Sequence, residues 1–224
     1  LLFRRSYKRG ANRSRPASGH APRTAVSQAH TKTSGKRRRL RVEGKKYKKE
    51  PIMAEDRPQI YLVTPPAFEL DIFPQRLAAA LDATDVACVR LALATKDEDM
   101  IGRAADACRT VTMERDVALV IENHLLLVER HGLDGVHLSD GAKQIRYARK
   151  ELGSDAIVGA YCGASRHEGM TAGEAGADYV CLGPIGESPL FTGERAEFDV
   201  FEWWSDVIEV PIVAEGALDE ALIT

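Results

Sequence analysis

Short apolar runs alternate with longer amphipathic stretches along the chain from residue 58 onward. The runs are rich in β-branched residues and nearly continuously apolar, which is typical of parallel strands that are covered on their outer face. The pattern therefore predicts strands at Ile60–Thr64, Val86–Leu93, Val117–Glu122, Gly135–Leu138, Ile157–Cys162, Tyr179–Leu182 and Pro211–Ala214.

The stretches between these runs have the spacing of amphipathic helices. In one of them Ile101, Ala104 and Cys108 recur at helical intervals, after an acidic first turn that suits the helix dipole. Gly153 and Gly176 directly follow two others, at a position where a left-handed residue favours glycine. We predict helices at Pro74–Leu81, Asp97–Thr112, Leu125–Glu129, Ala142–Leu152, His167–Ala175 and Phe198–Ile208.

The predicted strands and helices alternate in seven consecutive βα units. This order favours an α/β fold of the TIM (β/α)8-barrel type over an open doubly wound sheet, and no Gly-x-Gly-x-x-Gly follows the first strand. A barrel without its last strand would have two unpaired edges, which proteins avoid. We therefore expect an incomplete barrel whose eighth unit is missing, in a chain that is cut short at its C-terminus.

The first fifty residues differ in composition from the rest. The formal net charge of the chain is −2, yet residues 1–50 contain 17 Lys and Arg against only Glu43 and Glu50. This segment has almost no hydrophobic periodicity, and its basic runs at residues 36–39 and 45–49 repel one another. It cannot bury enough apolar surface to offset the entropy of ordering, so we predict a disordered basic leader.

Three functions of such a leader stay open: nucleic-acid binding, organelle targeting, and docking onto the acidic remainder of the chain. The chain does not begin with Met, and Met53 opens the part whose composition is globular. We therefore favour an upstream extension from a misassigned start over nucleic-acid binding. Our division is a leader at residues 1–52, which is not native on this interpretation, and an incomplete barrel domain at residues 53–224.

Neither a membrane span nor a disulfide framework is expected. No apolar run approaches the length of a transmembrane helix. The four cysteines lie far apart without paired spacing, which argues against a zinc ribbon and for reduced thiols in a cytoplasmic protein.

Small, polar or acidic residues follow most of the predicted strands. In a TIM barrel these carboxyl ends form the active site, with phosphate often held after the last two strands. A pocket for phosphate, metal or a heterocycle is therefore expected here. Its lining would come from the strand ends at residues 64–66, 93–95, 122–124, 139–140, 162–165, 183–185 and 215–217.

Four blocks of this sequence resemble one family. They are Ile60–Thr64, Gly135–Leu138, the segment Gly-Ala-Asp-Tyr-Val-Cys-Leu-Gly-Pro-Ile at Gly176–Ile185, and Val210–Val213. In this order they are similar to thiamine phosphate synthase and its thiazole-tautomerase relatives, over residues 58–224. The resemblance implies a transferase of thiamine biosynthesis. It would join hydroxymethylpyrimidine pyrophosphate to thiazole phosphate and release pyrophosphate, with Mg²⁺ neutralising the leaving group.

The resemblance also implies roles for particular residues. Glu122, Asn123 and Asp140 would surround Mg²⁺, since hard cations prefer oxygen ligands, although Asp140 is also suited to cap a helix that begins near Ala142. Glu122 and His124 are the candidate catalytic residues. The partners would be small phosphorylated heterocycles, and a homo-oligomer is left open. The candidate substrate-binding residues are Lys96, Asn123, Cys162, Ser165, Gly183 and Gly216.

The likeness is weaker at two places that matter for phosphate. The family ends its second strand in Gln-x-Arg-x-Lys; without gaps Val89, Leu91 and Leu93 stand there, and Arg90 is expected to point to the other face. Glu215 puts a negative charge where the family has a glycine-rich phosphate loop. Two alternatives therefore stay open: a tautomerase with Glu122 or His124 as the base, or a non-catalytic domain that binds a phosphate ligand.

For several other residues we favour a structural role. His137 is expected to be a hydrogen-bonded core histidine, because it lies inside a strand. Cys88 and Cys181 are expected to pack in the core. Trp203 and Trp204 lie on one predicted helix and are expected to cover the barrel.

Overall fold

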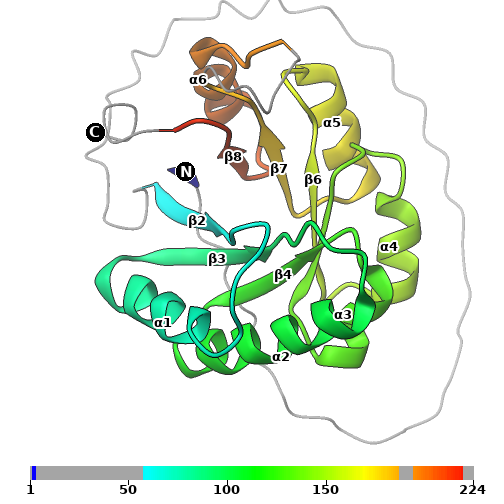
Figure 1. Cartoon of the computed structure of the whole chain (residues 1–224). Helices are drawn as coiled ribbons and strands as arrows, with labels where there is room; N and C mark the ends of the chain where they lie inside the picture. The colour runs from blue at the N-terminus through cyan, green and yellow to red at the C-terminus, as the bar shows by residue number, and fades with distance from the viewer. Residues whose placement is uncertain (1, 4–57, 187–193, 219–224) are drawn as a thin grey trace, which may run out of the picture. The chain divides into compact units, whose positions relative to one another are not determined.

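The structure is a computed structural model that describes residues 2–3, 58–186 and 194–218 (Figure 1). Seven parallel strands and six helices of this described part alternate along the chain, as predicted. The strands are β2 (Gln59–Val63), β3 (Val86–Leu91), β4 (Ala118–Glu122), β5 (Gly135–Leu138), β6 (Ile157–Tyr161), β7 (Tyr179–Leu182) and β8 (Ile212–Ala214).

The described helices lie on the outer side of the strands, from α1 beside β3 round to α6 near β8 (Figure 1). Asp97 caps the second of them through its side chain, which accepts from the N–H groups of Asp99 and Met100. Gly176 ends the fifth in the left-handed conformation, as expected for a glycine there. The helices are α1 (Phe73–Ala83), α2 (Glu98–Glu114), α3 (Leu125–His131), α4 (Ile145–Leu152), α5 (Arg166–Ala175) and α6 (Phe198–Val207). None of the described helices is long and apolar enough to cross a membrane.

The strands follow one another in chain order and close into a barrel. Each neighbouring pair from β2 to β8 is parallel. The gap between β8 and β2 contains β1 (Leu2–Phe3), which pairs antiparallel with both. We predicted disorder for these two residues; the unpaired N–H and C=O groups of the two edges explain why an extended segment pairs there. The rest of the predicted leader lies outside the described residues.

Two layers of apolar side chains hold the barrel together. The larger lies between the strands and the helices and includes Val89 and Leu91 of β3. The smaller fills the barrel interior and includes Tyr61, Val120 and Tyr179. Since strand side chains alternate, this division fixes which residues of every strand face inward.

Trp204 anchors α6 to the outer layer, as predicted for a residue that covers the barrel. Its side chain is 1% exposed, and its indole N–H donates to the carbonyl of Val210 at 2.7 Å. A Cβ added to Gly169 of α5 would lie 2.8 Å from the Trp204 ring, so a glycine there lets the ring lie against the helix. Trp203 packs against the same layer.

Candidate active site at the barrel mouth

Arg90 points into the barrel, which corrects the facing we predicted for β3. Its neighbours Val89 and Leu91 pack in the outer layer, so Arg90 lies on the inner face. One backbone hydrogen bond to the segment after β2 follows the strand, from the N–H of Ala94 to the carbonyl of Pro66. β3 ends at Leu91, and Leu91 and Leu93 both pack in the outer layer, so Ala92 follows Arg90 on the inner side, whereas Ala94 lines a hollow beside α1 and α2.

Three side chains contact the guanidinium of Arg90. Its Nη1 donates to Nε2 of His137 at 2.7 Å and to Oε2 of Glu215 at 3.0 Å, and its Nε lies 3.5 Å from Oε2 of Glu122. The side chains of Arg90 and Glu215 are 10% and 9% exposed. Burial alone would lower the pKa of Arg90, but Tyr61 and Glu215 raise it above its usual value, so the group stays cationic.

His137 is a hydrogen-bonded core histidine, as predicted, and its imidazole is neutral. Arginine has no acceptor, so Nε2 of His137 must be the unprotonated nitrogen, and Nδ1 carries the hydrogen. Nδ1 then donates to the hydroxyl of Tyr179 at 3.0 Å, and that hydroxyl lies 2.7 Å from the hydroxyl of Tyr61. Burial, with the charge of Arg90, lowers the pKa of His137 well below its usual range. A buried polar chain thus crosses the barrel.

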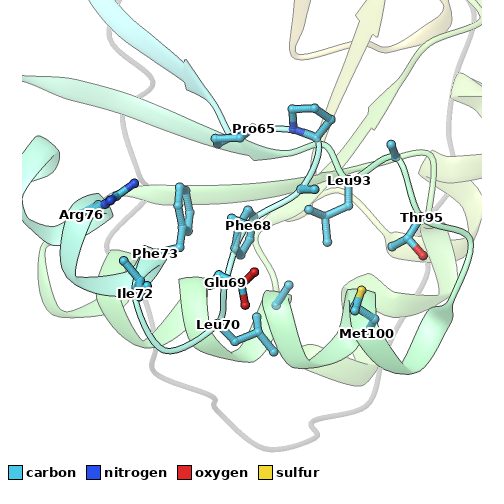
Figure 2. Close-up of a pocket in the computed structure, with 14 residues that line it drawn as sticks. Pro65, Phe68, Glu69, Leu70, Ile72, Phe73, Arg76, Leu93, Thr95 and Met100 are labelled. Atoms are coloured by element: carbon cyan, nitrogen blue, oxygen red, sulfur yellow. The ribbon is translucent and has the colours of Figure 1, made fainter.

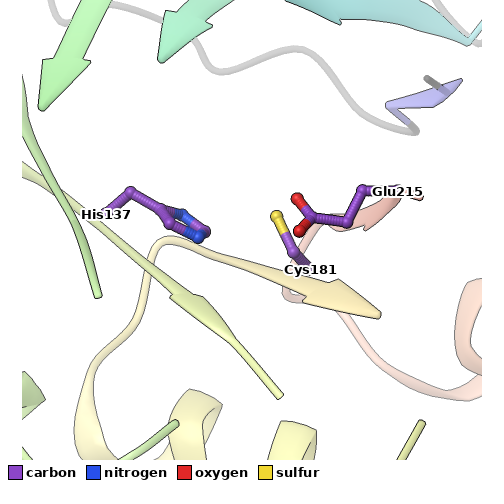
Figure 3. A group of neighbouring side chains, drawn as sticks. All are labelled: His137, Cys181 and Glu215. Carbon is purple, nitrogen blue, oxygen red and sulfur yellow. The ribbon is translucent and has the colours of Figure 1, made fainter. Parts of the chain in front are cut away.

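His137, Cys181 and Glu215 form a buried cluster whose ligand-type atoms lie within 4.8 Å of one another (Figure 3). Cysteine, histidine and carboxylate ligands of this kind are those that bind zinc in proteins. Here Arg90 already donates to two of its members. Burial, followed by the charge of Glu215, raises the pKa of the Cys181 thiol well above its usual value. The cluster is therefore an ion-pair network in which the guanidinium supplies the cation.

The sequence suggested that Glu215 is an unpaired negative charge at a phosphate loop. In the structure it belongs to this ion-pair network. The carboxylate that we expected to repel phosphate is neutralised by Arg90. The sequence could not indicate this pair, because the two residues stand 125 positions apart.

Glu122 and Asn123 lie at the end of β4. The side chain of Glu122 is 32% exposed. Asn123 has a left-handed backbone, with φ of 59°, and its side-chain Oδ1 accepts from both the N–H and the hydroxyl of Ser139. Asn123 thus ties the end of β4 to the end of β5. Its Nδ2 also donates to the Ser139 hydroxyl at 2.8 Å.

Asp140 lies just after β5 and directly follows Ser139, the hydrogen-bond partner of Asn123. Its Oδ2 accepts from the side chain of Gln144 at 3.1 Å, whereas its Oδ1 is buried without a hydrogen-bond partner in the described part of the chain. The helix-cap alternative is wrong, since α4 begins at Ile145 after a turn over residues 141–144. His124 precedes α3 without a side-chain cap bond.

Cys162 and Ser165, both predicted phosphate contacts, have other contacts here. Cys162 packs in the outer layer, and burial raises the pKa of its thiol to about 12. Ser165 caps α5, and its hydroxyl accepts from the N–H of Glu168 at 3.2 Å. The structure therefore does not bring Cys162 to the inner face.

Gly183 and Gly216 are needed where the backbones after β7 and β8 approach each other. A Cβ on Gly183 would lie 2.2 Å from the carbonyl oxygen of Glu215, and Gly216 has a φ of 90°. The N–H of Gly186 donates to the carbonyl of Gly216 at 3.1 Å.

Lys96, a predicted substrate-binding residue, is exposed in the loop after β3.

A hollow that the sequence did not indicate lies beside the loops after β2 and β3. It has a volume of about 880 Å³ and is bounded by α1, α2 and the segment Pro65–Leu70 (Figure 2). Phe68 and Phe73 stack at its side with ring centroids 3.9 Å apart. The prolines and aromatic residues that follow β2 are the signal that could have revealed it.

Residues 60–223 match the family model described as thiamine monophosphate synthase. The chain belongs to this family. A thiamine-phosphate synthase from Rhodospirillum centenum is 44% identical over 163 residues, which cover 71% of this chain and 78% of that protein. One from Erythrobacter litoralis is 38% identical over 168 residues, covering 71% and 77%. The resemblance inferred from four sequence blocks is thereby confirmed.

The fold of the thiamine monophosphate synthase family is also seen in a solved structure. A thiamine phosphate pyrophosphorylase from Pyrococcus furiosus superposes with a TM-score of 0.62 at 18% identity, covering 73% of this chain and 77% of that one. This likeness supports the TIM-type barrel. Arg90 lies on the inner face of β3, whereas Val89 and Leu91, where we placed the first two residues of the family's Gln-x-Arg-x-Lys, pack in the outer layer.

Proposed function

We propose that the protein is a transferase of the thiamine-phosphate synthase type, which joins hydroxymethylpyrimidine pyrophosphate to thiazole phosphate. The family match over nearly the whole barrel carries this proposal. The polar groups of Arg90, Glu122, Asp140 and Glu215 support it, because they come from four different strand ends at the face where TIM barrels place their active sites.

The proposed reaction needs positive charge where pyrophosphate leaves. Mg²⁺ would supply this by neutralising the leaving group when it is bound. The oxygen donors at the ends of β4 and β5 fit a hard cation, and the buried Oδ1 of Asp140 has no hydrogen-bond partner in the described residues. Glu122 and Asp140 would hold the ion, and Asn123, whose Oδ1 already accepts from Ser139, would position them.

The chain's own residues would do the rest. Arg90 would face the phosphate groups from the inner wall of the barrel, and Glu122 and His124 would stand beside the reacting heterocycle. Ser165, Gly183 and Gly216 would offer hydroxyl and backbone groups to phosphate. Lys96 would bind the substrate from the loop after β3, where its positive charge suits a phosphate group.

A second function is favoured by Ala92, which follows Arg90 on the inner side of the chain and offers no charge near the strand end where the family has Arg and Lys. A tautomerase acting on the thiazole phosphate would need a base such as Glu122 or His124 and no grip on pyrophosphate. A non-catalytic domain that binds a phosphate ligand would need neither.

The test is an assay of pyrophosphate release by the full chain with both substrates, with and without Mg²⁺. Release that depends on Mg²⁺ and falls in Glu122→Gln, with the exposed Glu129→Gln as the matched control, supports the synthase. Absence of release together with tight thiazole-phosphate binding would support the alternatives. We place the protein in the cytoplasm, in keeping with four free, buried cysteines.

A further inference from the structure

Three tyrosines of the described strands belong to the interior layer of the barrel, and one of them differs in exposure from the other two. Tyr61 and Tyr179 are 1% and 3% exposed, and their hydroxyls bond to each other. Tyr161 is the last residue of β6 and is only partly buried. Cys162, the next residue, packs in the outer layer, so alternation places Tyr161 on the inner side, at the mouth of the barrel.

The hydroxyl of Tyr161 is already engaged by the protein. It donates to the carbonyl of Gly183, just after β7, at 2.7 Å. Burial, followed by the charge of Glu215, raises the pKa of the phenol, so the group stays neutral and remains a donor. Since the polar end of the side chain is fixed in this way, what the residue still offers to a ligand is the flat face of its ring.

The neighbouring strand ends leave this ring uncovered. Gly163, Gly183 and Gly216 follow β6, β7 and β8, and none of them has a side chain that could lie over the ring. A Cβ built on Gly163 would meet nothing within 4 Å, so the space beside the end of β6 is open. The N–H of Gly183 donates to the carbonyl of Gly163 at 3.0 Å, which brings these two glycines together. The ring of Tyr161 therefore stands at an edge of the mouth that is otherwise made of backbone.

We infer that the ring of Tyr161 stacks on the thiazole ring of the phosphorylated substrate, with the hydrogen bond to Gly183 fixing the orientation of the phenol. The inference rests on the ligands of the proposed function. The phosphate of this substrate would lie against the backbone after β7 and β8, where TIM barrels often hold phosphate. β6 is the neighbour of β7, so a ring joined to that phosphate by a short chain reaches the tyrosine.

Stacking would make Tyr161 a determinant of specificity. A tyrosine ring attracts another planar ring in an offset or edge arrangement, and it gives no such preference to an aliphatic phosphate. A role limited to holding the carbonyl of Gly183 leads to a different expectation, because the hydroxyl and not the ring would then matter. Variants that keep one of these features and remove the other separate the two roles.

The test is calorimetric titration of the full chain with thiazole phosphate and, separately, with glycerol phosphate. Tyr161→Phe keeps the ring and loses the donor, whereas Tyr161→Gln keeps a donor and loses the ring. We expect Tyr161→Gln to weaken the binding of thiazole phosphate about fivefold or more, and Tyr161→Phe to weaken it less than about twofold. The affinity for glycerol phosphate should be the same in all three proteins. Tyr147→Gln, on the exposed side of α4, is the matched control and should change neither affinity.

The inference is overturned if the wild-type chain does not bind thiazole phosphate, or if Tyr161→Gln binds it as tightly as the wild type. A loss in Tyr161→Phe as large as that in Tyr161→Gln would overturn it too, as would an equal loss for both ligands. If Tyr161→Gln does not fold, Tyr161→Leu takes its place. Phe and Leu both lack the hydroxyl, so a difference between them still reports on the ring alone.

The two proposals fail separately. Binding of thiazole phosphate that follows these variants, without release of pyrophosphate from the two substrates, removes only the synthase. Release of pyrophosphate by a chain whose affinity for thiazole phosphate is unaffected by loss of the ring removes only this inference.

Discussion

Arg90 of β3 and Glu215, which follows β8, form an ion pair with Nη1 3.0 Å from Oε2. The two strands are not neighbours in the barrel, so their side chains meet across its interior. The pair is accompanied by a neutral acceptor, His137, on β5. One cation thus links three separate strands.

This pair should matter strongly for stability when only one partner is lost. Arg90→Met leaves the carboxylate of Glu215 buried without its cation, and we expect a loss of about 3–5 kcal/mol in the free energy of unfolding. The double variant Arg90→Met/Glu215→Met should recover much of that loss, because no charge stays buried. Urea unfolding of the three proteins measures this.

The control pair is Arg115 and Asp82, whose carboxylate is exposed. Breaking it should not measurably change the unfolding midpoint, because exposed ion pairs contribute little. If breaking either pair lowered the free energy of unfolding by the same amount, burial of the Arg90–Glu215 pair would not explain its contribution to stability.

The order and type of the elements could be predicted because each has a local signal. Apolar runs and helical spacing identified all seven parallel strands and all six helices of the described residues. The facing of β3 could not be predicted in this way, since Val86–Leu91 is apolar on both faces apart from Arg90. A strand buried on both sides has no alternation to show which side is inner.

The candidate site was predictable only in part for a related reason. Strand ends identified Glu122, Asn123 and Asp140 because a parallel barrel brings its carboxyl ends together. The partners of Arg90 depend on which strands lie opposite each other across the barrel. Local sequence does not contain that information. Our prediction also placed the start of α4 at Ala142, whereas a turn over residues 141–144 precedes the helix.

Stability should fall in mild acid because of His137. Its pKa is lowered in the folded protein, by burial first and then by Arg90. Below the pKa of about 6.5 of an unfolded histidine, the unfolded chain binds a proton that the folded chain does not. The free energy of unfolding should therefore decrease as pH falls through that value, by up to about 1.4 kcal/mol per pH unit from this group.

Urea unfolding between pH 7.5 and pH 5 measures this slope in the wild type and in His137→Gln, which retains an acceptor and a donor. We expect the variant to be less stable at neutral pH. Its free energy of unfolding should also change less steeply with pH, by the contribution of this one group. An identical slope in both proteins would exclude His137 as its source.

The four cysteines should resist thiol reagents in the folded protein. All four are free and buried, and burial raises the pKa of Cys88 and Cys108 to about 12. Because the thiolate is the reactive form, a colorimetric disulfide reagent at pH 8 should label the native chain slowly. In guanidinium the same chain should release four equivalents at once, and rapid labelling without denaturant would contradict the burial.

A positive charge added on the inner side of the chain just after β3 should strengthen the binding of pyrophosphate. Ala92→Arg adds a charge directly after Arg90, on the side of the chain that faces inward, and should tighten binding about tenfold. Thr110→Lys, which adds a charge on the exposed side of α2, should have no effect. If Ala92→Arg changed the affinity no more than this control, Ala92 would not lie at the pyrophosphate site.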